Sequence, residues 1–142
     1  MKISTENLSR CIRTLKTSLE MLEKATPESI EFEIYRNAVV KGFELTLETC
    51  GKLLRKALKQ YTGAPRNVDQ LVFKDVFREA LKHGLIVDQD TVERWFAYRE
   101  NRNNTAHDYG IGFAEETLKL LPGFLTDAGS VEAAIAEKFG HD

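Results

Sequence analysis

The chain has 142 residues, of which 42% are hydrophobic and 30% charged, and this predicts one globular domain spanning residues 1–142. The N-terminal stretch MKISTENL lacks the apolar run of a signal peptide, and no stretch reaches the roughly 18 apolar residues of a membrane span, so we expect a cytoplasmic protein without membrane association. A net charge of −2 argues against a generally basic nucleic-acid-binding surface while allowing a local basic cleft, and two cysteines, Cys11 and Cys50, are too few for a disulfide framework or a zinc site.

The first half of the chain shows the apolar spacing of two amphipathic helices. Residues 4–25 carry apolar side chains every three or four positions, which predicts the first helix. Thr26 is then expected to be the N-cap of a second helix, with Pro27 in its first turn. This helix is predicted to run to about Tyr61, with a main apolar stripe formed by Phe43, Leu47, Cys50, Leu54 and Leu58.

The second half predicts shorter helices separated by turns. After the turn cluster 62–67, a third helix is expected at 69–82, ended by His83-Gly84, and a fourth at 91–104. A helical pattern resumes at 113–121, Pro122 is expected to kink or end it, and a last short helix is predicted at 130–139. No alternating strand pattern is present. The fold class is therefore all-α, an antiparallel bundle of four or five helices.

Several common catalytic signatures are absent from the sequence. There is no P-loop, G-x-G-x-x-G, C-x-x-C or H-E-x-x-H pattern, so ATP cleavage, dinucleotide redox chemistry and zinc hydrolysis have no local support. The basic segment 52–59 could contact phosphates. We interpret it instead as cations that complement the dipole at the end of a helix. We predict no metal and no cofactor.

One polar stretch, residues 102–107, pairs an arginine with a histidine five positions later. Arg78 and His83 show the same spacing, but they lie in an ordinary helical pattern, where such positions point about 140° apart. Between Arg102 and His107 the polar side chains of residues 103–105 compete with the helical backbone for hydrogen bonds, so we expect the helix to loosen there. A loosened turn could bring both side chains to one phosphate. The alternative is a polar helix end with a hydrogen-bonded histidine.

An arginine and a histidine without a metal cluster suit RNA cleavage. The 2′-hydroxyl attacks the adjacent phosphate, an imidazole moves a proton, and a guanidinium stabilises the charge on the phosphoryl oxygens. The nucleophile belongs to the substrate, so no metal ion is needed. Arg99, one helical turn before Arg102, could line the same groove and bind substrate.

The stretch R-N-N-T-A-H-D-Y, residues 102–109, resembles the R-x-x-x-x-H-x-Y signature of HEPN domains of the HepT kind. The flanking sequences, including FELTLETCGKLL, FKDVFREALKHGLI and VERWFAYREN, are similar to the same family, once called nucleotidyltransferase substrate-binding proteins. The resemblance implies a homodimeric helical bundle and a metal-independent endoribonuclease, the toxin of a toxin–antitoxin pair. Arg102 and His107 would be catalytic and Asn103 would support them.

The same resemblance implies a partner, a minimal nucleotidyltransferase that acts as antitoxin. This enzyme would transfer AMP from ATP onto the motif tyrosine, here Tyr109, and silence the nuclease. The alternative for Tyr109 is a structural tyrosine that packs its ring at the loop after the fourth helix. Two other functions remain open: a non-catalytic module that presents a substrate to the nucleotidyltransferase, and a plain scaffold bundle.

Overall fold

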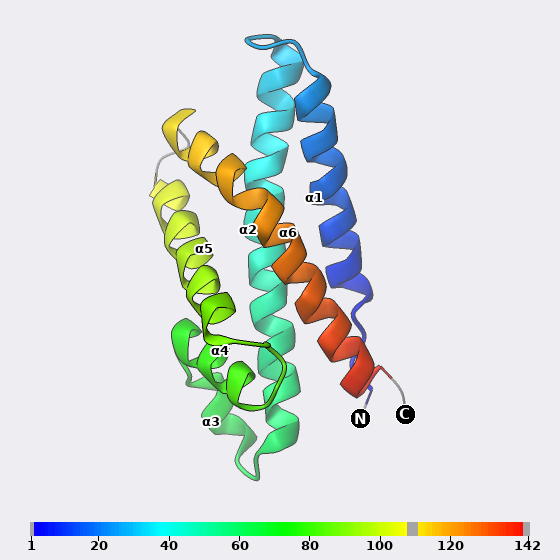
Figure 1. The fold of residues 1–142 in the computed structure, drawn as a ribbon, viewed down its shortest axis with the longest axis vertical. Helices are drawn as coiled ribbons and strands as arrows, with labels where there is room; N and C mark the ends of the chain where they lie inside the picture. The colour runs from blue at the N-terminus through cyan, green and yellow to red at the C-terminus, as the bar shows by residue number, and fades with distance from the viewer. Residues whose placement is uncertain (1, 108–110, 141–142) are drawn as a thin grey trace.

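The computed structural model describes residues 2–107 and 111–140, without the side chains of residues 105–107 and 111–113. Throughout these ranges the regular elements are helices, which confirms the predicted all-α class (Figure 1). No helix among them is long and apolar enough to cross a membrane. The elements are α1 (Glu6–Lys24), α2 (Ile30–Leu58), a 3₁₀ turn (Lys59–Tyr61), α3 (Pro65–Asp69), α4 (Phe73–Lys82), α5 (Gln89–His107) and α6 (Ile111–Phe139).

The long helices α1 and α2 form an antiparallel pair, and α6 lies across both (Figure 1). The start of α2 corrects the predicted cap at Thr26. Ser29 is the N-cap instead, because its Oγ accepts a hydrogen bond from the backbone N–H of Phe32 at 3.1 Å. Pro27 therefore precedes the helix, in a turn where Glu28 has a φ of 68°.

The predicted third helix, 69–82, is two helices in the structure. The short α3 begins at Pro65, which lies in its first turn, where the missing N–H costs no hydrogen bond. The extended backbone of Val72, with a ψ of 160°, separates α3 from α4. The predicted end of α4 is confirmed, since Gly84 follows it with a φ of 75° that a glycine adopts without strain.

Of the two outcomes predicted for Pro122, a kink or a helix end, the end is wrong: α6 continues through it from Ile111 to Phe139 and includes the separate helix predicted at 130–139. A proline inside a helix removes one backbone hydrogen bond and costs about 3 kcal/mol. Burial of one face of α6 offsets this cost, because five apolar side chains along it are at most 1% exposed: Leu121, Phe124, Ala128, Val131 and Ile135.

An aromatic cluster at the centre joins four helices. Phe43 of α2 lies 4.6 Å from Phe124 of α6, and Phe77 of α4 stacks on Trp95 of α5 at 4.8 Å, measured between ring centroids. Tyr98 meets Phe43, Trp95 and Phe124 edge to face. This cluster holds α5 against the rest of the bundle.

The two ends of the chain meet at one end of the bundle. The backbone N–H of Ile3 donates to the carbonyl of Phe139 at 2.7 Å. The C-terminal end of α5 and the N-terminal end of α6 lie at the opposite end of the molecule (Figure 1). The predicted candidate residues are thus remote from the termini.

Two glycines of α2 provide a matched test of this packing. A Cβ on Gly51 would meet only Phe73 Cε2, at 4.0 Å, whereas one on Gly42 would lie 3.2 Å from Cδ1 of the fully buried Leu15. We expect Gly51→Ala to raise the free energy of unfolding by about 0.5–1 kcal/mol, and Gly42→Ala to lack this gain because α1 packs too closely. Urea denaturation measures both, and equal gains would contradict the close approach of α1 and α2.

Candidate functional site

The motif helix α5 is regular over its whole length, which corrects two predictions. Its start is capped by Asp88, whose Oδ1 accepts from the N–H and the hydroxyl of Thr91 at 2.8 and 2.7 Å, and these bonds lower the pKa of Asp88. Its end lies at His107, beyond the predicted residue 104. The helix does not loosen at residues 103–105, because the buried Asn101 fixes the preceding turn by donating to Thr117 of α6 at 2.8 Å.

Arg102 lies against α2, between two carboxylates. Its Nη2 is 3.2 Å from Oε1 of Glu48 and 3.5 Å from Oε1 of Glu44, and its side chain is 24% exposed. Glu44 also pairs with Lys41 at 3.7 Å. The guanidinium is therefore held beside α2 and is partly exposed to solvent.

The other predicted site residues occupy different positions around α5. Asn103 is exposed, and the guanidinium of Arg99 lies 4.9 Å from the ring centroid of Phe73 on α4. His107 is the last residue of α5, and its side chain, like the whole of Tyr109, lies outside the described part. Since α5 is regular, the backbone positions 102 and 107 point about 140° apart, and the helix itself does not bring the predicted pair together.

The second pair with this spacing, Arg78 and His83, diverges as expected. Arg78 bonds Asp75 at 2.9 Å and lies over the ring of Phe96, at 5.2 Å from its centroid. His83 stacks on Tyr61 at 4.4 Å between centroids. Each side chain has its own structural partner, so this pair forms no common site.

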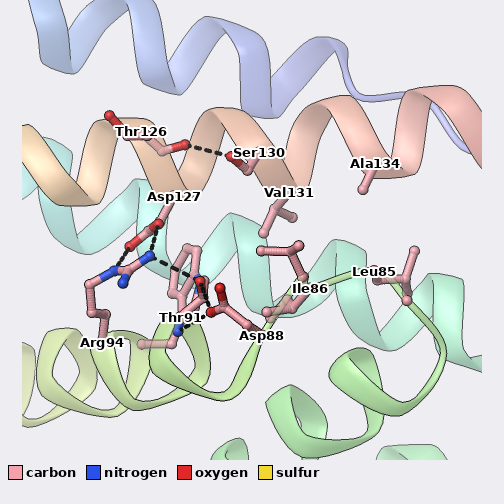
Figure 2. A pocket seen from close by; sticks show the side chains of 13 residues that line it. Leu85, Ile86, Asp88, Thr91, Arg94, Thr126, Asp127, Ser130, Val131 and Ala134 are labelled. Carbon is pink, nitrogen blue, oxygen red and sulfur yellow. Dashed lines mark hydrogen bonds and ion pairs between the residues drawn. The ribbon is translucent and has the colours of Figure 1, made fainter.

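A partly buried polar network that the sequence did not reveal ties α5 to α6, and Figure 2 shows its Arg94, Thr91 and Asp127 side chains. The carboxylate of Asp127, in a residue only 5% exposed, accepts two bonds from Arg94 at 2.9 and 3.0 Å and one from the hydroxyl of Tyr98 at 2.5 Å. The bonds to Asp127 raise the pKa of Arg94, and burial, followed by the bond to Asp127, raises that of Tyr98. These partners lie 29 and 33 residues apart, so no local pattern predicts them.

The same network forms one wall of a hollow of about 470 Å³ between the 84–88 connection, α5 and α6 (Figure 2). Arg94 also donates to Thr91 at 2.9 Å, so the polar groups of this wall bond one another. We therefore interpret the hollow as part of the α5–α6 contact. Among the described residues no cluster of histidine, cysteine, aspartate and glutamate is arranged to hold a metal ion.

We expect Tyr98→Phe to lower the free energy of unfolding by about 1 kcal/mol at neutral pH, because a buried hydrogen bond to Asp127 is lost. In the folded state the pKa of Tyr98 is raised above its ordinary value of 10.0, so the folded state favours the neutral phenol. Its contribution is complete below about pH 10 and is lost as the pH rises further. The wild type should therefore lose stability above that pH more steeply than Tyr98→Phe. Urea denaturation across this range, with Tyr35→Phe as control, measures the difference, and equal slopes would contradict it.

Comparisons with known proteins assign the chain to a family. The family model "Nucleotidyltransferase substrate binding protein like" matches residues 6–137. A Haemophilus influenzae protein named probable ribonuclease HepT is 28% identical over 116 residues, which cover 82% of this chain and 77% of that protein. The structure of HI0074 from the same organism, described as the fold of a substrate-binding domain of a nucleotidyltransferase, matches with a TM-score of 0.79 at 24% identity, over 93% of this chain and 98% of that one. The chain therefore belongs to the nucleotidyltransferase substrate-binding protein-like family and is a HepT-like protein.

Proposed function

We propose that this chain is a metal-independent endoribonuclease, the toxin of a HEPN and nucleotidyltransferase pair. The observation that carries the proposal is the R-x-x-x-x-H-x-Y motif, residues 102–109, in a chain of this family. A relative named probable ribonuclease HepT supports it. Arg102 and His107 are the proposed catalytic residues.

The proposed reaction is transesterification of RNA. His107 takes the proton of a 2′-hydroxyl, whose oxygen attacks the adjacent phosphorus. The bond from phosphorus to the 5′-oxygen breaks, and this oxygen takes a proton from solvent water, so a 2′,3′-cyclic phosphate and a 5′-hydroxyl form. Arg102 stabilises the charge that develops on the phosphoryl oxygens. Asn103, exposed beside it, donates a supporting hydrogen bond to the phosphate.

The surroundings of Arg102 fit this role. Glu44 and Glu48 hold the guanidinium from the α2 side by Nη2, and a phosphate entering from the solvent side meets a cation that is already oriented. Glu44 and Glu48 also partly neutralise the positive charge that Arg102 presents to RNA. Binding therefore needs further cations nearby, of which Arg99 is the first, one turn earlier on α5.

A symmetric homodimer would complete the site. In the regular α5, positions 102 and 107 of one chain point about 140° apart. In a dimer, Arg102 of one copy could instead face His107 of the other across a shared cleft. Apolar side chains suited to such a contact are exposed on α2, at Leu45 beside the Arg102 partner Glu44 (46%) and towards the start of the helix at Ile30 (69%) and Ile34 (57%). We propose that residues 99–109 of both copies line this cleft.

A second candidate function is a non-catalytic module that presents a substrate to a nucleotidyltransferase. The description of HI0074 as a substrate-binding domain, together with the carboxylates that partly neutralise Arg102, favours it. Expression of the chain without its partner separates the two functions. A toxin arrests growth, whereas a binding module leaves growth unchanged.

We expect the purified, unmodified protein to cleave RNA in EDTA and to leave cyclic-phosphate ends. His107→Ala should abolish cleavage, and Arg102→Ala should cost on the order of 3 kcal/mol of transition-state stabilisation, because the phosphoryl charge loses its cation. Gel analysis of a labelled RNA measures both effects. Arg78→Ala and His83→Ala, with the same spacing, are matched controls and should retain full activity.

Two outcomes sharpen this test. Cleavage that persists in His107→Ala, after a contaminating nuclease is excluded, rules out the assignment. If the pair forms across the dimer, a mixture of Arg102→Ala and His107→Ala proteins should regain activity, because one of the two sites in a mixed dimer then has both native residues. A mixture without activity would argue that each site is built within one chain.

We propose that the partner nucleotidyltransferase regulates the nuclease through Tyr109. The phenolic oxygen attacks the α-phosphorus of ATP, the bond to the β-phosphate breaks, and pyrophosphate leaves. The product is a phosphodiester with a negative charge and a nucleotide two positions after His107. This charge would compete for Arg102, and the nucleotide would occupy the place of RNA.

After co-expression with the partner, we expect intact-mass spectrometry to find one or more AMP groups on the chain and peptide mapping to place them on Tyr109. Tyr109→Phe should cleave RNA and resist both modification and silencing, because it lacks the acceptor hydroxyl. Tyr35→Phe, which changes a tyrosine of α2, should still be silenced. An unmodified Tyr109 in a fully inactive complex would mean that the partner acts by binding alone.

A further inference from the structure

A groove of about 430 Å³ lies next to Arg102, between α2, α4 and α5. It is lined by three cations, Lys52, Arg55 and Arg99, and by one acidic residue, Glu48. Glu48 also accepts from Arg102 at 3.2 Å, so the groove adjoins the proposed catalytic arginine directly. We call this feature the basic groove. It stands out in a chain whose net charge is −2.

The three cations of the basic groove are not neutralised by carboxylates. Elsewhere Lys59 pairs with Asp69 at 2.7 Å and Arg94 with Asp127 at 2.9 Å. By contrast, no ion pair among the described residues involves a groove cation. Their positive charge therefore remains available to an anion.

Neutral contacts hold two of these cations in place. Arg55 donates from Nη1 to the carbonyl of Val68 at 2.9 Å, and Arg99 lies over the ring of Phe73. A cation that is already positioned loses little conformational freedom when it binds a phosphate. The groove also offers apolar surface, since Val72 is 63% exposed and Phe73 is half-buried. Cations combined with aromatic and apolar surface are typical of sites that bind single-stranded nucleic acid.

We propose that the basic groove binds the phosphate and base of a nucleotide that flanks the scissile bond. The substrate is then single-stranded RNA that continues from Arg102 across α2 towards α4. This inference rests on the proposed ribonuclease function and assigns Lys52 and Arg55 to substrate binding, together with Arg99. It also replaces the interpretation of segment 52–59 as cations that only complement a helix dipole, because Lys52 and Arg55 face the groove.

Gly51 provides a way to close the groove without disturbing the core. It lines the groove, and a Cβ there meets only Phe73 Cε2 at 4.0 Å. Gly51→Gln adds a neutral side chain that fills the groove, whereas Gly51→Ala leaves it open. The two variants keep the same charge, so a difference between them reports occupation of the groove alone.

The experiment measures binding of a fluorescent single-stranded RNA to the His107→Ala protein at several salt concentrations. Lys52→Gln and Arg99→Gln should each weaken binding at low salt and reduce the slope of log Kd against log salt by about 0.7, so each variant loses about fivefold less affinity than its parent for every tenfold rise in salt. Lys16→Gln is the same change on the exposed face of α1, and it should alter neither the Kd nor its salt slope. Gly51→Gln should weaken binding, and Gly51→Ala should bind like its parent. In the active protein, the groove variants should raise KM more than they lower kcat.

Other outcomes overturn the inference in distinguishable ways. If the wild type cleaves RNA but the groove variants match the Lys16→Gln control, the ribonuclease stands and the groove is not its subsite. If the groove variants weaken capture of the purified nucleotidyltransferase and leave RNA binding unchanged, the groove serves the partner protein. If the wild type neither binds nor cleaves RNA, the proposed function fails and the groove assignment fails with it.

Discussion

The carboxylate of Asp127 determines which way the motif helix faces. Three N–H and O–H donors of α5 converge on it from Arg94 and Tyr98, and one turn later Asn101 bonds Thr117, so one face of α5 is fixed to α6 over residues 94–101. A satisfied buried network of this kind favours one arrangement over others, because any slip leaves polar groups unpaired. The other face of α5 must then meet α2 and α4, and that face carries Arg99 and Arg102.

This division of α5 explains how one helix serves both structure and the proposed chemistry. Trp95 and Tyr98 complete the aromatic core, while Arg99 and Arg102 point towards α4 and α2. Arg102 sits where α2 supplies carboxylates, and Arg99 sits where α4 supplies an aromatic ring. The two arginines thus have different neighbours: one is balanced by negative charge, and the other keeps its charge for a ligand. This difference suits a reacting phosphate at Arg102 and a neighbouring phosphate at Arg99.

The sequence predicted the fold well where one amphipathic stripe dominates and poorly where packing opposes a local preference. The stripe of α1 and the glycine after α4 were sufficient to place those elements. Pro122 and residues 103–105 both suggested interruptions, yet the helices continue, because burial along α6 and the bond from Asn101 to Thr117 outweigh the local cost. The break before α4 had no glycine or proline to mark it, since Val72 alone provides the extended residue.

The candidate site was predictable only as far as its local motif. Arg102, Asn103 and His107 follow from their spacing and from the family resemblance. The acidic partners of Arg102 lie on α2, 54 and 58 residues earlier in the chain, so the local sequence around residue 102 does not predict them. The basic groove was also hidden, because Lys52 and Arg99 become neighbours only when α2 and α5 pack. In the sequence alone, the cations of segment 52–59 are explained by their favourable interaction with the dipole at the C-terminal end of a helix.

The bond from Ile3 to Phe139 has a practical consequence for handling the molecule. The first and last described segments of the chain lie together, and in Figure 1 they are on the side of the molecule away from α5. A fluorescent protein or a surface tether fused at either end therefore leaves the α2–α5 surface open to RNA and to a partner. The same proximity suits circular permutation: a short linker can join the ends, and the chain can be reopened at Gly63, where no heavy atom lies within 4 Å of an added Cβ. Such a permutant keeps every helix intact while placing the new termini between α2 and α3.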